Sequence, residues 1–303
     1  MNIDLRTLLY PVSRVLPNLR WCNYAIAAVY FLRANGRLPR KSHLANAEIN
    51  DFIFQRMIVD GWSAIERRCV DKEFAKALAG RASNVNVPPT VAVFSLERNP
   101  RIEDFITWLR PHIGKHLIAK PTHGSGTVLF LDRVITDGEI EAFFSDANRN
   151  FFHAIRETQY KALERKILVE DNIAKTRAIN DYKFFCVKGR VLYCQVDVDR
   201  FTNHKRAICT VPDFAIIPVC TKFLERPDHL RRPPRFDEMV RIASEMSREF
   251  SFVRIDLYDT DDGVYFGEYT LTPGAACDNF SDPRFAAEFL HNVKALLDDD
   301  SVG

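Results

Sequence analysis

Two stretches in the second half of the chain constrain its fold most strongly. Residues 182–187 and 191–198 flank a Lys-Gly-Arg turn and alternate well enough to predict an antiparallel hairpin. Residues 253–258 and 264–270 flank an acidic turn that ends in glycine, and they predict a second hairpin. Apolar residues recur at helical spacing before, between and after these hairpins. Antiparallel strands with helices between them indicate an α+β fold rather than a doubly wound parallel sheet.

The other elements follow from the same periodicities. Residues 46–78 predict helices with a break near Gly61, and further helices are expected near residues 101–111, 137–144, 151–163, 236–250 and 283–297. Strands are expected at residues 90–94 (short and buried), 117–120, 128–131, 166–169 and 206–211. We therefore divide the chain into a helical region at 1–80, a first lobe at 81–175 and a second lobe at 176–303.

Composition limits the class of protein. The chain has 303 residues, of which 47% are hydrophobic and 27% charged, as is ordinary for a soluble enzyme with a substantial core. The net charge of +2 argues neither for nor against an acidic partner, and no nucleic acid partner is expected. Seven cysteines without a CxxC spacing indicate neither a zinc site nor a redox motif. Cys186, Cys194 and Cys209 are expected to be core residues in a reducing cytoplasm.

The first seventy residues are rich in arginine and lysine. This basic region could be a solvated helical face, or it could contact a membrane surface or a polyanionic glycan. Residues 24–32 are apolar but too short to span a bilayer, and arginines bracket them. A buried helix or an interfacial helix would both fit. The chain is expected to be cytoplasmic, either soluble or peripheral to the inner face of a membrane.

A glycine-rich loop follows the strand predicted at 117–120. Its sequence KPTHGSG contains Lys120, His123, Gly124, Ser125 and Gly126. Such a loop can present backbone N–H groups to phosphate oxygens, and the lysine adds a positive charge for the same anion. The loop is not a Walker A element, because no GK[ST] follows and no helix starts there. The alternative is a simple glycine-containing hairpin turn.

The second predicted hairpin brings acidic residues together. Residues two apart on a strand share a face, so Arg254 and Asp256 can converge with Glu268 and Thr270. Two carboxylates on a buried sheet face repel each other unless a cation or proton intervenes. Magnesium takes one or two carboxylates plus substrate phosphates, which this hairpin could offer. The alternative is a pair of surface carboxylates.

Further polar residues lie along the first hairpin. Lys183 sits between aromatic neighbours in DYKFF, so its ammonium needs an anion, either a nucleotide phosphate or Asp181 or Glu170. The segment DVDRFTNHKRA adds Arg200 and Arg206, whose guanidinium groups could hold a triphosphate or an acidic substrate.

In this order along the chain, these clusters resemble one known arrangement. The chain resembles the ATP-grasp superfamily, most closely its TupA-like branch, which is associated with teichuronopeptide and related cell-surface polymers. The matching stretches, from about residue 50 to 280, are FIFQRMIVDGWSAIERRCVDKEFAKALAG, KPTHGSG, ILVEDNI, NDYKFFCVKGRVLYCQVDVDRFTNHKRA and FVRIDLYDTDDGVYFGEYTLTPGAA.

The resemblance implies a site in which ATP lies between two α+β lobes. Lys120 and residues 123–126 would approach the phosphates, Glu170 and the backbone near Asp171 would hold the adenine or ribose, and Lys183 would be a second phosphate-side lysine. Asp256 and Glu268 would hold Mg²⁺, with Thr270 as the next ligand where many relatives have asparagine. Arg254 would stabilise an acyl phosphate, and Arg206 would hold phosphate or an acidic substrate.

The implied activity is that of a carboxylate–amine ligase that uses ATP and Mg²⁺. Its partners would be an acidic sugar of a surface polysaccharide, such as a capsule, and an amino acid or amine. An ATP-dependent kinase acting on a sugar hydroxyl is the runner-up, since its nucleotide half would look the same. A catalytically inactive binding module in a glycan-assembly complex is a third possibility.

Overall fold

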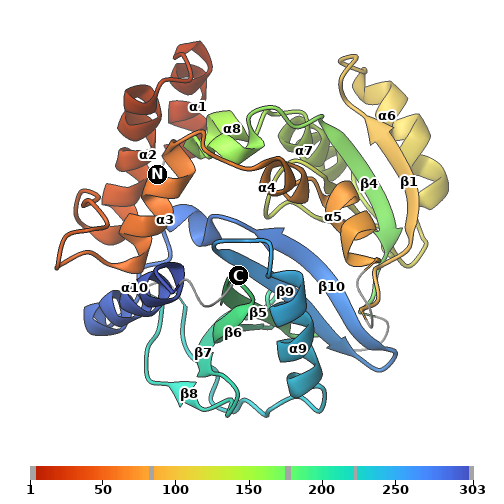
Figure 1. Ribbon diagram of the computed structural model, residues 1–303. Coiled ribbons are helices and arrows are strands. Elements are labelled where there is room, and N and C mark those ends of the chain that lie inside the picture. The colour runs from red at the N-terminus through yellow and green to blue at the C-terminus, as the bar shows by residue number, and fades with distance from the viewer. Residues whose placement is uncertain (1–4, 82–84, 175–178, 222–223, 300–303) are drawn as a thin grey trace.

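The fold is built on two antiparallel sheets. A computed structural model describes residues 5–81, 85–174, 179–221 and 224–299 (Figure 1). Four strands form a small sheet in the order β1-β4-β2-β3, and six form a large sheet in the order β10-β9-β5-β6-β7-β8. The α+β class is therefore confirmed. The strands are β1 (Thr90–Ser95), β2 (Leu117–Pro121), β3 (Leu129–Phe130), β4 (Lys166–Asp171), β5 (Asp181–Val187), β6 (Arg190–Val198), β7 (Lys205–Thr210), β8 (Ile216–Ile217), β9 (Val253–Thr260) and β10 (Gly263–Thr270).

Both predicted hairpins of the large sheet are present. β5 pairs with β6, β9 pairs with β10, and the two hairpins join through a β5–β9 pairing. Every residue of β5 is buried, so both faces of this central strand are covered. The β9–β10 turn is shorter than we predicted, because the strands extend to Thr260 and from Gly263.

Helices cover both sheets. They are α1 (Leu5–Val15), α2 (Arg20–Asn35), α3 (Ile49–Ile58), α4 (Ala64–Cys69), α5 (Lys72–Ala79), α6 (Ile102–Leu109), α7 (Asp137–Ala147), α8 (Phe152–Ile155), α9 (Phe236–Met246) and α10 (Pro283–Leu297), with 3-10 turns η1 (Arg110–His112), η2 (Thr158–Tyr160) and η3 (Pro273–Ala276). The break predicted near Gly61 separates α3 from α4. A second break precedes α5, where Asp71 caps the helix through its side chain.

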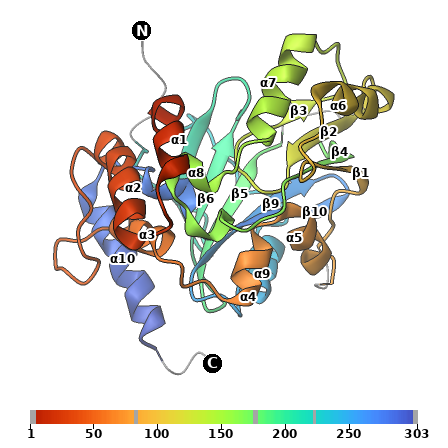
Figure 2. The ribbon, with the colours of Figure 1, turned by 90° about the horizontal axis from the view of Figure 1, so that it is seen from above.

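Three hydrophobic cores hold the layers together. On one face of the large sheet, α4, α5 and α9 pack against side chains such as Phe184 and Leu257. On the other face, α2, α3 and α10 pack against Phe185 and Phe252. The small sheet packs against α6 and α7 around Phe105. Figure 2 shows the small sheet and the N-terminal helices at opposite ends of the molecule.

Two predicted elements differ from the structure. The strand at 90–94 is not buried: β1 is an edge strand whose residues are exposed or half-buried. The helix at 151–163 is wrong, because only α8 and η2 form there. The helix ends where Arg156 takes a left-handed conformation (φ 65°). Arg156 then buries its guanidinium group against carbonyl oxygens that end α1, including those of Leu16 and Pro17. A tertiary contact thus overrides local helical periodicity.

The prediction that Cys186, Cys194 and Cys209 are core residues is confirmed, since all three are buried. Within the described residues, no helix combines the length and the apolar character needed to cross a membrane.

Candidate functional site

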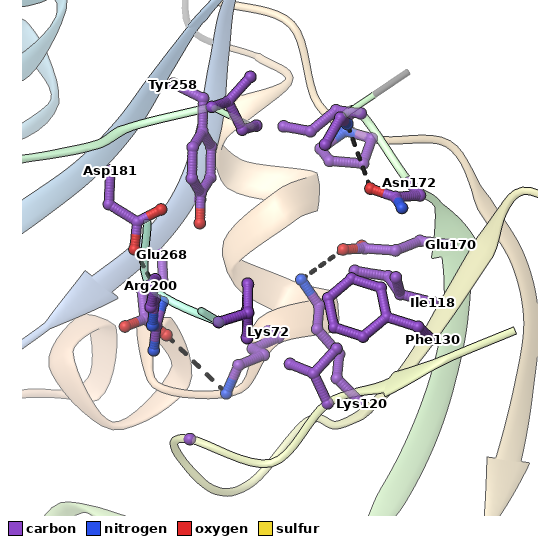
Figure 3. Close-up of a pocket in the computed structure, with 18 of the residues that line it drawn as sticks. Lys72, Ile118, Lys120, Phe130, Glu170, Asn172, Asp181, Arg200, Tyr258 and Glu268 are labelled. Carbon is purple, nitrogen blue, oxygen red and sulfur yellow. Dashed lines mark hydrogen bonds and ion pairs between the residues drawn. The ribbon is translucent and has the colours of Figure 1, made fainter. Parts of the chain in front are cut away.

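A cavity of about 240 Å³ lies between the two sheets. Figure 3 shows Ile118 and Phe130 of the small sheet beside Glu170 and Lys120, with Asp181, Arg200 and Glu268 on the opposite side. Tyr258, Phe266 and Phe201 add apolar surface. The cavity therefore combines an apolar wall with closely spaced charges of both signs. Such a combination suits a ligand with a flat apolar part and an anionic part.

The acidic corner of the cavity depends on a β-bulge. β9 and β10 pair in regular register up to Leu257 and Phe266, and the next pair is Asp256 with Glu268. Gly267 is the extra residue. Cross-strand partners share a face, whereas a one-residue slip would turn Glu268 to the other side of the sheet. A Cβ atom on Gly267 would lie 2.8 Å from Tyr258 Cε2 and 3.0 Å from the Asp256 carbonyl oxygen, so only glycine fits.

Behind this corner, the large sheet carries a buried ionic network. Lys183 Nζ lies 2.9 Å from both Asp181 Oδ2 and Asp256 Oδ2. Arg254 donates two hydrogen bonds of 2.7 Å to the Asp256 carboxylate. Burial alone would raise the pKa of Asp256, but Arg254 and Lys183 outweigh it and the pKa is lowered. Burial would lower the pKa of Lys183, but Asp256 and Asp181 outweigh it and the pKa is raised. Asp256 and Lys183 are therefore held in their charged forms.

The small-sheet side has a second group of charges, centred on Glu170. This buried carboxylate accepts from Lys76 Nζ at 2.5 Å and forms an ion pair with Lys120. Burial would raise the pKa of Glu170, but the two ammonium groups outweigh it and the pKa is lowered. The pKa of Lys76 is lowered, because its burial outweighs the attraction of Glu170. Glu170 thus orients two lysines, and Lys120 is the one that reaches the cavity.

Lys72 was missed in the sequence analysis. It lines the cavity, donates a hydrogen bond to the Gly124 carbonyl oxygen and lies 4.0 Å from Glu268 Oε2. Burial lowers the pKa of Lys72; Glu268 opposes this shift and Lys120 adds to it. A signal was present in VDKEFAKA. Lys72 is the first residue of α5, where the helix dipole disfavours a cation, and Lys76 follows at the repulsive i+4 spacing. Both features point to an anion nearby.

The structure places the predicted residues in three positions: in the cavity lining, behind the cavity on the large sheet, and farther from the cavity. The residues that line the cavity are Lys120, Ser125, Gly126, Glu170, Asp171 and Glu268. Behind the cavity on the large sheet lie Lys183, Arg254, Asp256 and Thr270, whose hydroxyl is 3.1 Å from Arg254 Nη2 and 3.3 Å from Glu268 Oε1.

The remaining predicted residues lie outside the cavity lining. His123 is buried with Nε2 3.3 Å from the Arg149 carbonyl oxygen, and Gly124 contributes its own carbonyl oxygen to Lys72. Arg206 lies deeper in the large sheet, 2.5 Å from Asp197 and 3.2 Å from Asp278. Asp197 is 3.9 Å from Lys183, so Arg206 is linked to the ionic network through Asp197.

Two carboxylates, Asp256 and Glu268, form the acidic corner and are the candidate ligands for Mg²⁺. Asp256 and Glu268 are cross-strand partners, and Glu268 faces the cavity with 27% of its side chain exposed. Both oxygens of Asp256 accept from Arg254, and one of them also from Lys183. In the described part of the chain, no three His, Cys, Asp or Glu side chains gather into a metal site. Of the two, Glu268 is the carboxylate that is open to the cavity, and it suits a cation that takes one carboxylate and completes its shell with phosphate oxygens and water.

A comparison with known protein families identifies the family to which the chain belongs. The family model described as TupA-like ATPgrasp matches residues 64–292, so the chain belongs to the TupA-like ATP-grasp family. The predicted family and its ATP-grasp fold are therefore confirmed. No curated protein matches the sequence.

Several solved structures are similar to the chain. One is the ATP-grasp ligase PsnB with its minimal precursor, with 13% identity, 77% of this chain and 62% of that chain covered, and a TM-score of 0.39. The VanG D-Ala:D-Ser ligase from Enterococcus faecalis has 16% identity to the chain and a TM-score of 0.42, and the match covers 76% of this chain and 62% of that chain. The D-alanine–D-alanine ligase from Bacillus anthracis with ATP has 13% identity and a TM-score of 0.40, and the match covers 76% of this chain and 63% of that chain. The chain spans about three-fifths of the length of these structures.

Proposed function

We propose that this protein is an ATP-dependent carboxylate–amine ligase. The observation that carries the proposal is the pair of lysines, Lys72 and Lys120, that enter one cavity opposite Glu268 and beside the glycine-rich loop. Two ammonium groups with a loop of small residues suit a phosphate chain, and the apolar surface of Ile118 and Phe130 suits a base. Family membership supports the same assignment.

The proposed reaction has two steps. A carboxylate oxygen of the acid attacks the γ-phosphorus of ATP, the bond to the bridging oxygen breaks, and ADP leaves. An amine nitrogen then attacks the acyl carbon of the acyl phosphate, the bond to the phosphate oxygen breaks, phosphate leaves and the nitrogen loses a proton. In such chemistry a protein contributes mainly positioning and charge neutralisation, so no covalent nucleophile is required.

Named residues would share this work. Lys72 at the start of α5 and Lys120 of the small sheet would hold the phosphates. Lys183, behind the cavity, would add positive charge on the phosphate side and hold Asp181 and Asp256 in place. Arg254 keeps the Asp256 carboxylate in place and lies 3.6 Å from Glu268, where it would stabilise negative charge on the acyl phosphate. Glu268, with Asp256 and Thr270 behind it, would hold Mg²⁺, which would neutralise charge on the β- and γ-phosphates.

The substrates and the place of action are also proposals. Resemblance to a branch associated with cell-surface polymers supports an acidic sugar as the carboxylate and an amino acid or amine as its partner. The ATP requirement supports a cytoplasmic site of action. Arg200 lines the cavity and binds Asp181 at 2.8 Å, so a guanidinium group is available there for an acidic substrate. Arg206, beyond the lining, would support this region from behind.

The test is an isotope-transfer assay. The protein is incubated with ATP, magnesium, an amino acid mixture and a uronic acid labelled with ¹⁸O in its carboxylate. Ligation predicts ¹⁸O in the released phosphate and an amide detected by mass, both dependent on the amine. A stable phosphorylated sugar without phosphate release would instead identify a kinase. Failure of magnesium-ATP to raise the melting temperature would leave a non-catalytic binding module.

A matched pair of variants localises the activity. Glu268→Gln is expected to lower the rate of ADP formation at least about a hundredfold, since the carboxylate proposed to hold Mg²⁺ beside the phosphates is lost. Glu245→Gln, on α9 in a surface pair with Arg241, should leave the rate unchanged. Full activity in Glu268→Gln would remove this residue from the proposed metal site.

A further inference from the structure

The N-terminal helices present an unusual outer surface. On α1, Leu8, Val12 and Val15 follow one another at i, i+4 and i+7, and their side chains are exposed, Val15 by 82%. On α2, an apolar row on the outer side includes Trp21, which is 66% exposed. Among the described side chains of residues 8–35, the exposed large hydrophobic residues, which we call the α1–α2 face, are Leu8, Val12, Val15, Leu19, Trp21, Tyr24, Val29 and Leu32. Exposed apolar patches of this kind mark interaction sites.

This face is not simply the inner side of a helix left open. α2 buries Ile26, Ala27 and Phe31 against α3 and the large sheet, so its core-facing side is already filled. Leu9 and Leu16 pack on the same core from α1 and the residue that follows it. The α1–α2 face is therefore a second apolar side, directed away from the protein.

The charge of this region is one-sided. Residues 5–47 contain no aspartate or glutamate, while the whole chain has a net charge of only +2. The basic residues in this range are Arg6, Arg14, Arg20, Arg33, Arg37, Arg40 and Lys41. Of these, Arg37 and Arg40 bind Glu48, whereas Arg14, Arg20, Arg33 and Lys41 are exposed. The two helices and the segment after them thus combine exposed apolar side chains with exposed cations.

A hollow of about 800 Å³ opens beside this face, between α2, α3 and residues 39–43. It is lined by Arg20, Arg40 and Lys41, together with the aromatic rings of Trp21 and Tyr24. No acidic side chain is among the residues that line it in the described chain. Cations beside tryptophan and tyrosine rings are suited to phosphate headgroups at the level of a membrane interface.

The face is also held rigidly. The Arg156 guanidinium group, buried on the side of α8, donates to Ser13 Oγ at 2.7 Å and to the carbonyl oxygens of Leu16 and Pro17 at 3.0 and 3.1 Å. The same group donates to Asn23 Oδ1 at 3.2 Å. One side chain therefore fixes the end of α1 against the start of α2. The surface is preformed, so little ordering entropy opposes its use.

We propose that the α1–α2 face docks on an anionic lipid bilayer. Apolar side chains gain free energy by entering the acyl boundary, and the exposed cations are attracted to anionic headgroups. A polyanionic glycan would satisfy the cations but offers nothing to Leu8, Val12 and Val15. A second copy would bring the same cations against one another, because a twofold interface pairs a patch with itself. In Figures 1 and 2 these helices lie at the end of the molecule opposite the small sheet, so docking leaves that lobe away from the bilayer.

The experiment is vesicle co-sedimentation of the full chain. Phosphatidylcholine vesicles with phosphatidylglycerol should bind the protein, phosphatidylcholine vesicles alone should bind it weakly, and added salt should lower binding. Trp21 fluorescence should shift to the blue on binding, and the shift should vanish in Trp21→Phe. Failure to bind the anionic vesicles overturns the proposal.

Two variants matched in charge and exposure sharpen the test. Val15→Glu should weaken vesicle binding by about tenfold or more, because an apolar contribution is lost and repulsion is added. Val134→Glu, at a residue 87% exposed just before α7 in the other lobe, should bind as the unmodified chain does. Equal loss in both variants contradicts docking through this face. A concentration-dependent dimer, or binding to a soluble anionic polysaccharide but not to vesicles, assigns the face to those partners instead.

Discussion

The two sides of the cavity use the same kinds of charged residue in different ways. On the large sheet, Lys183 and Arg254 are buried and bind Asp181 and Asp256 at 2.7–2.9 Å. Across the cavity from this network, Lys120 of the small sheet and Lys72 at the start of α5 reach the cavity itself. One side is a set of charges that satisfy one another inside the protein. The other offers ammonium groups to whatever enters.

This difference indicates that the buried ionic network of the large sheet and the lysines at the cavity have different roles. A buried ion pair contributes little net stability, yet loss of one partner is costly, because an unpaired charge stays behind. The large-sheet network is therefore expected to control folding and the geometry of the acidic corner. The lysines at the cavity are expected to control ligand affinity with a smaller effect on folding. The following predictions test this separation, from the largest effect to the smallest.

Removal of Lys183 should have the largest effect on stability. In Lys183→Met, Asp181 and Asp256 would each lose an ammonium group 2.9 Å away and keep Arg200 and Arg254, respectively, and the expected loss is about 3 kcal/mol in the free energy of unfolding. Lys120→Met should lose only about 1 kcal/mol, because Lys76 still binds Glu170. Urea denaturation measures both values. Similar losses in the two variants would mean that the sides do not differ.

The β-bulge is the next test. In Gly267→Ala the new methyl group would meet Tyr258 and the Asp256 carbonyl oxygen, which should cost about 1–3 kcal/mol and displace Glu268. Weaker binding of magnesium-ATP should accompany the loss of stability. Gly138→Ala is the control, since nothing lies within 4 Å of its Cβ position in α7. An alanine tolerated at both glycines would show that the bulge does not need its glycine.

Lys120 should affect affinity more than folding. Lys120→Ala is expected to weaken magnesium-ATP binding by about tenfold, the equivalent of one charge-assisted hydrogen bond. Lys115→Ala changes an exposed lysine of the same segment and should leave the affinity unchanged. Isothermal titration calorimetry measures both. An unchanged affinity in Lys120→Ala would place the phosphates elsewhere.

The sequence predicts the sheets well and the site less completely. Both hairpins, the helix expected near residues 137–144 and the glycine-rich loop follow from local patterns, and the structure has them. The bulge at Gly267 could not be predicted, because the need for glycine there arises from the close approach of Tyr258 on the neighbouring strand. The turn at Arg156 depends on carbonyl oxygens more than a hundred residues away in sequence.

Partner choice is the other limit. Lys183 was expected to bind an anion, but its sequence does not choose between Asp181 and a phosphate, and the register of β5 and β9 places Asp256 opposite it. Glu170 was expected to contact the adenine or ribose, which stays a prediction, and its pairing with Lys76 depends on how α5 packs. Pairings across distant elements are set by tertiary packing.

The last comparison concerns the pH dependence of stability. The pKa of Glu170 is lowered below 4.5: burial would raise it, but Lys120 and Lys76 outweigh burial. Because the folded-state pKa is lowered, the stabilisation by this carboxylate is present above pH 4.5 and is lost as pH falls below that value. Glu170→Gln should therefore be less stable near neutral pH, and its unfolding curve should converge with that of the unmodified chain as pH falls.

An exposed carboxylate provides the control for this acid effect. The pKa of Glu139 is lowered from 4.5 to about 2, chiefly by its hydrogen bond with Arg133, but this pair is exposed to solvent. The screening length falls from about 10 Å at 0.1 M salt to about 3 Å at 1 M, so high salt weakens an exposed pair and weakens a buried pair much less. Added salt should therefore reduce the effect of Glu139→Gln and leave that of Glu170→Gln. If salt reduced both equally, the charges around Glu170 would be as open to water as those at the surface.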